Sequence, residues 1–66
     1  MKNTELIKII GNNIQLARLK KGLTQEKLSE KCNVSSQYIS AIESGRTSGS
    51  LSLMIEICNI LDVSPN

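Results

Sequence analysis

The chain has 66 residues, of which 39% are hydrophobic and 21% charged, and its formal net charge is +2. This length allows one domain with a single small core, and the composition is that of a globular domain rather than a disordered chain. No apolar run reaches the ~20 residues that a membrane span needs, and no secretory leader is visible, so we expect a cytoplasmic protein.

The residue types that metal and enzyme sites require are sparse. There is no histidine, and the two cysteines, Cys32 and Cys58, are too few to complete a zinc site. In a cytoplasmic protein we expect both thiols to be reduced and to pack as small apolar side chains. Neither a glycine-rich phosphate loop nor a nucleophile with an evident base is visible. The sequence therefore predicts no cofactor, no metal and no enzymatic activity.

The first predicted helix spans about residues 5 to 20. Thr4 is a candidate N-cap, Gly22 can end the helix, and Gly11 weakens its middle. Apolar residues at helical spacing should form its buried face, namely Leu6, Ile10, Ile14 and Ala17. Most of the basic residues of the chain also lie in its first half. This asymmetry suits a polyanionic partner, although solvated helix faces would give the same pattern.

Two shorter helices follow, at about residues 25–32 and 36–43, and Thr24 and Ser35 are their candidate N-caps. Asn33 lies between them and tolerates the positive φ that a sharp turn requires. Ser29 is small enough for the point at which the two helices cross. The apolar set that should join the helices is Leu28, Cys32, Val34, Ile39 and Ile42. This spacing predicts a helix-turn-helix at about residues 24–43.

The outer side of the third helix is almost free of charge. Its residues are Ser36, Gln37, Ser40, Ala41 and Ser44. An ordinary surface helix carries Lys and Glu on its outer side. Short hydroxyls, an amide and a methyl group instead allow a helix to lie close against a flat polar target, which favours a recognition role.

A loop rich in Ser and Gly, residues 44–50, leads to a fourth helix at about 51–60 with Ser50 as its N-cap. Its buried face is expected at Leu51, Met54, Ile57, Cys58 and Leu61. The remaining apolar residues are Leu53, Ile55 and Ile60, with Val63 just beyond. They suggest a homodimer seam, or packing beneath a fifth helix that would begin in the segment 62–65. The fold class is therefore all-α: a compact bundle of four to five short helices, forming one domain over residues 1–66.

The run from Arg18 to Lys31 reads RLKKGLTQEKLSEK, and it is followed by VS at 34–35, IS at 39–40, IESGR at 42–46 and SL at 50–51. With these motifs the chain resembles the lambda-repressor/Cro-like (XRE-type) helix-turn-helix DNA-binding family over about residues 10–65. The resemblance implies five short helices that work as a dimer on a two-fold-symmetric operator. The family usually has Gly in place of Asn33, Ala in place of Ser29 and often Pro in place of Gly49.

The resemblance also suggests which residues meet DNA. Base contacts are expected from Ser36, Gln37 and Ala41, because a Gln amide can pair with N6 and N7 of adenine and a small methyl can touch a thymine methyl. Backbone contacts are expected from Thr24, Gln25, Ser35, Tyr38, Ser40, Ser44 and Arg46. Tyr38 has a second interpretation, as a cover for the edge of the core. Lys21 and Lys27 are weaker candidates for phosphate contacts.

Arg18 and Glu43 have a different implied role. In similar domains residues at these places pair with each other and brace the first helix against the third. We therefore expect a partly buried structural ion pair.

The expected function is sequence-specific binding to double-stranded DNA as a small transcriptional regulator, a repressor in the first interpretation. The chain would act as a homodimer, with helix 36–43 in the major groove of a palindromic operator. The alternative is an antitoxin or protein-interaction module that kept this fold. No membrane or small-molecule partner is expected.

Overall fold

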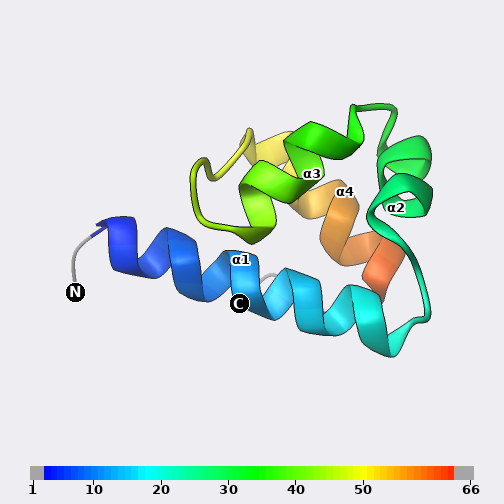
Figure 1. The fold of residues 1–66 in the computed structure, drawn as a ribbon, viewed down its shortest axis with the longest axis horizontal. Coiled ribbons are helices and arrows are strands. Elements are labelled where there is room, and N and C mark those ends of the chain that lie inside the picture. The colour runs from blue at the N-terminus through cyan, green and yellow to red at the C-terminus, as the bar shows by residue number, and fades with distance from the viewer. Residues whose placement is uncertain (1–2, 64–66) are drawn as a thin grey trace.

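The computed structural model describes residues 3–63, and these form four α-helices without a strand. The helices are α1 (Asn3–Lys20), α2 (Gln25–Cys32), α3 (Ser36–Glu43) and α4 (Leu51–Leu61). Figure 1 shows α1 running the length of the molecule, with the other three helices gathered along one side of it. The all-α prediction is confirmed. The segment at which a fifth helix was expected to begin runs into residues 64–66, which lie outside the described part of the chain.

Three helices begin with the same hydrogen bond, from a backbone N–H to a side-chain hydroxyl. Thr24 Oγ1 accepts from the N–H of Lys27 at 3.0 Å. The Oγ atoms of Ser35 and Ser50 accept equivalent bonds from Tyr38 and Leu53, each at 3.1 Å. Each cap satisfies an N–H group that has no partner within the helix, and such a cap contributes about 1 kcal/mol. The predicted caps Thr24, Ser35 and Ser50 are thereby confirmed.

The turn between α2 and α3 is built on a left-handed residue. Asn33 has φ 59° and ψ 42°, and its N–H donates to the carbonyl oxygen of Glu30. The N–H of Val34 then donates to Ser29 O at 3.0 Å, which completes the end of α2. Asn is one of the few residues other than Gly that takes this conformation at modest cost.

The start of α1 corrects two predictions. The helix already includes Asn3, so Thr4 lies within it and is not its N-cap. Leu6 is exposed rather than buried, because the first turns of α1 extend past the end of the other helices (Figure 1). Ile10 is also exposed, and it lines a shallow hollow together with Leu51 and Met54. Further along α1, Gly11, Ile14 and Arg18 are buried, and Ala17 is partly buried against the core, as predicted for Ile14 and Ala17.

The buried stripe of α4 also differs from the prediction. Leu51 was expected inside and is 77% exposed, whereas Leu53 is only 8% exposed. Leu53, Ile57 and Leu61 recur every four residues and form one stripe that packs on the core. The first turn of α4 follows an exposed loop, so its first residue points to solvent while its third reaches the interior.

One hydrophobic core joins all four helices. Its buried members are Ile14, Leu28, Cys32, Ile39, Ile42, Leu53, Ile57 and Leu61. Both cysteines are buried and neither forms a disulfide, as predicted. Burial, and after it the negative charge of Glu56, raise the pKa of the Cys32 thiol above its ordinary value. This thiol therefore stays protonated at neutral pH and packs as an apolar group.

Candidate nucleic-acid interface

The crossing of α2 and α3 determines how α3 is presented. Ser29, which was predicted to lie at the crossing, is buried and donates its hydroxyl to Glu26 O at 2.7 Å. A small side chain here lets the two helices approach closely, and the hydrogen bond satisfies the buried hydroxyl. Leu28 and Ile39, which are fully buried, pack beneath the crossing. The predicted recognition helix therefore packs on the buried core through its apolar side.

The two sides of α3 differ in burial as well as in chemistry. Ile39, Ile42 and Glu43 are buried, whereas Gln37 and Ser44 are exposed. The half-buried residues between them are Ser36, Tyr38, Ser40 and Ala41. The only charged side chain of α3, Glu43, is thus turned into the protein. The uncharged outer side remains open to a ligand, which is what groove recognition requires.

A buried ion pair links α1 to α3. Arg18 Nε lies 2.7 Å from Glu43 Oε2, and Arg18 Nη2 donates to Oε1 at 3.2 Å. The side chains are only 8% and 2% exposed, respectively. Arg18 Nη1 also donates to Leu23 O at 2.7 Å, so the same guanidinium holds the segment that leads into α2. Each charge is therefore both neutralised and hydrogen-bonded, which buried charges need.

Gln25 shares this carboxylate, a contact that sequence reasoning missed. Its Nε2 donates to Glu43 Oε1 at 3.0 Å. The amide nitrogen carries two hydrogens, so one N–H is left for a phosphate oxygen. Gln25 stands at the start of α2, where the partial positive charge of the helix also favours an anion. The ion pair therefore positions a predicted DNA-backbone contact.

The residues after α3 place a guanidinium at its carboxyl end. Arg46 Nε donates to Ser44 Oγ at 3.0 Å, and that hydroxyl in turn donates to Ala41 O at 3.2 Å. Both side chains are exposed. No hydrogen bond within residues 3–63 involves the two terminal nitrogens of Arg46, which leaves them available for a bidentate phosphate contact.

The other predicted backbone contacts lie along the same elements. Thr24 and Ser35 use their hydroxyl oxygens as caps, and each hydroxyl still has its hydrogen to donate. Tyr38 packs against the core, and its hydroxyl lies beside Gly49, where an added Cβ would be 3.3 Å away. This placement favours its interpretation as a cover for the core edge, and its phosphate contact stays a prediction.

The predicted dimer seam is only partly available at the surface. Leu53 belongs to the monomer core, and Ile60 is half-buried against it, so Leu53 is withdrawn from the seam. Ile55 and Val63 are exposed, at 44% and 42%. Sequence reasoning missed Leu51 as a candidate for the seam, although it is the most exposed large apolar side chain in residues 3–63.

No helix within residues 3–63 is long and apolar enough to cross a membrane. Nor does this part of the chain bring together three or more side chains of the His, Cys, Asp and Glu type in an arrangement that could hold a metal ion.

A helix-turn-helix family model matches residues 14–66. Together with the fold and the outer side of α3, this match shows that the chain belongs to the lambda-repressor/Cro-like (XRE-type) family of DNA-binding helix-turn-helix regulators. The domain therefore has the helix-turn-helix fold and belongs to a class of transcriptional regulators.

Individual relatives agree with this assignment. An uncharacterized HTH-type transcriptional regulator, y4dJ of Sinorhizobium fredii (strain NBRC 101917 / NGR234), is 35% identical over 60 residues, which are 91% of this chain and 78% of that protein. The restriction-modification controller protein C.AhdI from Aeromonas hydrophila superposes with a TM-score of 0.89 at 25% identity, covering 98% of this chain and 94% of that one. The clp gene regulator ClgR from Corynebacterium glutamicum superposes with a TM-score of 0.86 at 33% identity, covering 91% of this chain and 64% of that one.

Proposed function

We propose that this domain is a sequence-specific transcriptional repressor that binds double-stranded DNA as a homodimer, with α3 in the major groove of each half of a palindromic operator. The observation that carries the proposal is the exposed, uncharged outer side of α3 on a braced support. A major groove about 12 Å wide admits one α-helix. Repression requires only that the operator be occupied, and a DNA-binding domain supplies this by itself.

Each group of side chains has a distinct part in this proposal. Gln37, the exposed amide of α3, reads a base. Ala41 lies one turn further along the same side of the helix, and Ser36 precedes Gln37 at the start of α3. Arg46 and Gln25 hold phosphates at the two ends of the helix-turn-helix and fix its register on the duplex.

Selection of bound sequences from random duplex DNA tests the function directly. The proposal expects a palindromic motif whose half-sites lie about 34 Å apart, one turn of the double helix. Failure of the purified chain to retain any duplex at low ionic strength would contradict DNA binding. That result would favour the alternative of a protein-interaction module, because phosphate contacts are strongest at low salt.

Gln37→Ala should lower affinity for the selected operator by about 1–3 kcal/mol, roughly 5- to 150-fold, because a bidentate base contact is lost. On duplexes altered at the one base pair that Gln37 reads, the wild type and Gln37→Ala should bind with equal affinity. Fluorescence anisotropy titrations measure both effects. The matched control is Asn59→Ala, which removes an exposed amide from α4. Equal losses from the two variants would contradict the role given to Gln37.

The homodimer is proposed to form through an apolar face that α4 and α1 share. Leu51 and Ile55 of α4 are exposed, and Ile10 of α1 lines the same shallow hollow as Leu51 and Met54. The occupant that we propose is a second copy of the chain. A symmetric face of this kind joins two monomers through the same residues and matches the two-fold symmetry of a palindromic site.

Leu51→Glu should weaken self-association at least tenfold, because Leu51 is exposed and lines the hollow, where the glutamate would have to be desolvated in the seam. Sedimentation velocity over a range of concentrations measures this change. Leu16→Glu is the matched control, since Leu16 is another exposed apolar residue, on α1, and lies outside the hollow. A wild-type chain that stays monomeric at high concentration would rule out the seam.

A further inference from the structure

The first half of α1 touches the loop that follows the recognition helix. Gly45 has φ 80°, and a Cβ built on it would lie 2.5 Å from Cγ of Lys8 and 2.9 Å from its Cα. Only a residue without a side chain fits so close to another backbone. Gly45 therefore fixes the position of Lys8 relative to Arg46, which is the next residue of the loop.

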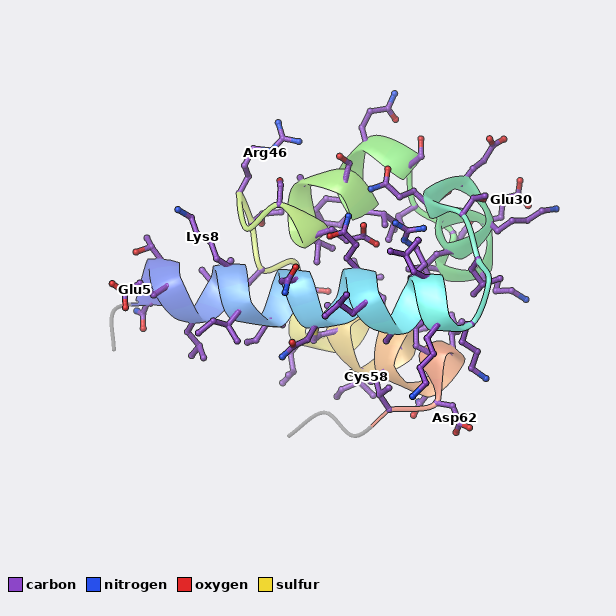
Figure 2. The ribbon with its side chains drawn as sticks, turned by 60° about the horizontal axis from the view of Figure 1, so that its bottom comes forward. Glu5, Lys8, Glu30, Arg46, Cys58 and Asp62 are labelled. Atoms are coloured by element: carbon purple, nitrogen blue, oxygen red, sulfur yellow. The ribbon has the colours of Figure 1, made fainter. Side chains whose placement is uncertain are left out.

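This contact places two cations on the same side of the molecule. Figure 2 shows the side chains of Lys8 and Arg46 projecting from α1 and from the loop toward the side on which α3 lies. Both residues are exposed. Within residues 3–63 the only ion pair is that of Arg18 with Glu43, so Lys8 makes no ion pair there. Glu5, one turn earlier on α1, forms no ion pair with it in this part of the chain.

The loop itself adds no negative charge between these cations. Residues 44–50 contain serine, glycine, threonine and Arg46, without an acid. A positive strip therefore continues from the carboxyl end of α3 onto α1. Such a strip suits the phosphates that flank a helix seated in the major groove, since a Lys ammonium on a flexible stem acts as a mobile point charge.

We propose that Lys8 contacts a DNA phosphate next to the one held by Arg46, so that α1 extends the interface beyond the helix-turn-helix. This inference rests on the proposed function and adds a contact to it. Because Lys8 would touch only the backbone, it contributes affinity and salt dependence without a base preference of its own.

The test compares the salt dependence of operator affinity for Lys8→Gln and the wild type. The plot of log K against log salt concentration has a negative slope, and in Lys8→Gln this slope should become shallower by about 0.9 for each copy bound, with the preferred bases unchanged. Lys8→Arg should keep the wild-type slope. The control, Lys31→Gln, removes the same charge at a hollow that Lys31 shares with Glu56, and its slope should stay near the wild-type value.

The outcomes separate the two proposals. If wild-type chain binds its operator and Lys8→Gln leaves the slope unchanged, or changes it no more than Lys31→Gln does, the Lys8 contact is wrong while the proposed function stands. If the wild-type chain binds no duplex, both proposals fail. Ethylation interference gives a second readout: one phosphate per half-site should lose its effect in Lys8→Gln and keep it in Lys31→Gln.

Discussion

Arg18→Met should lower the free energy of unfolding by about 3–5 kcal/mol, because it leaves Glu43 as an unpaired charge in the interior. The carboxylate is 2% exposed, so water cannot replace the guanidinium without opening the packing of α1 on α3. The same change removes the donor to Leu23 O, which Arg18 Nη1 bonds at 2.7 Å. The segment entering α2 would therefore loosen as well.

This loss is large relative to the total stability of so small a domain. A stability of 0.05–0.15 kcal/mol per residue amounts to roughly 3–10 kcal/mol for a chain of this size. The midpoint of thermal unfolding should therefore fall by at least about 12 °C, measured by circular dichroism. Arg46→Met is the matched control, because Arg46 is exposed, and its midpoint should stay within a few degrees of the wild type.

A double variant distinguishes a stranded charge from simple loss of packing. Arg18→Met combined with Glu43→Leu removes both charges and should recover most of the stability lost in Arg18→Met alone. An unchanged midpoint in the single variant would show that the pair does not brace the fold. No recovery in the double variant would show that the arginine acts through its packing.

Gly11→Ala should destabilise the domain by about 1–3 kcal/mol, although alanine favours helix over glycine by about 1 kcal/mol. A Cβ at this position would clash with the carbonyl oxygen of Ile42 and lie 2.9 Å from that of Glu43. These atoms belong to the last turn of α3, so the added methyl group must push α1 and the recognition helix apart.

The matched control for Gly11→Ala is Asn12→Ala. Asn12 is the next residue of α1 and is exposed, so its replacement should raise the thermal midpoint slightly through helix propensity alone. Opposite shifts of the two midpoints are the expected result. A midpoint that rises in Gly11→Ala would mean that α1 and α3 are not in close contact at this point.

The features that were predicted from the sequence depend on residues near one another in the chain. The hydroxyls of Thr24, Ser35 and Ser50 cap helices by accepting a hydrogen bond from the N–H of the residue three positions later. Asn33 ends α2 through the left-handed conformation of its own backbone. Such local chemistry is visible in a single sequence, because the residue type and its spacing specify the interaction.

The features that were not predicted depend on how distant segments pack. Periodicity identified α1 and α4 as amphipathic helices but could not show which apolar residues lie beyond the reach of a partner helix. Leu6 and Leu51 were therefore placed inside, and Leu53 was assigned to the dimer seam. The contact of Lys8 with the loop at Gly45 likewise joins segments far apart in the chain. Gly11, within α1, is a sequence signal of the close approach of α1 to α3, but from the sequence alone it is interpreted only as a weak point of the helix.

Chemical-shift mapping of the ¹⁵N-labelled domain, titrated with its selected duplex, tests the central claim most directly. The account predicts that the largest shifts of backbone amides occur along the outer side of α3 at Gln37, Ser40 and Ala41, with further shifts at Gln25 and Arg46. Amide shifts confined to α4, or the absence of any shift at low ionic strength, would contradict recognition of DNA by α3.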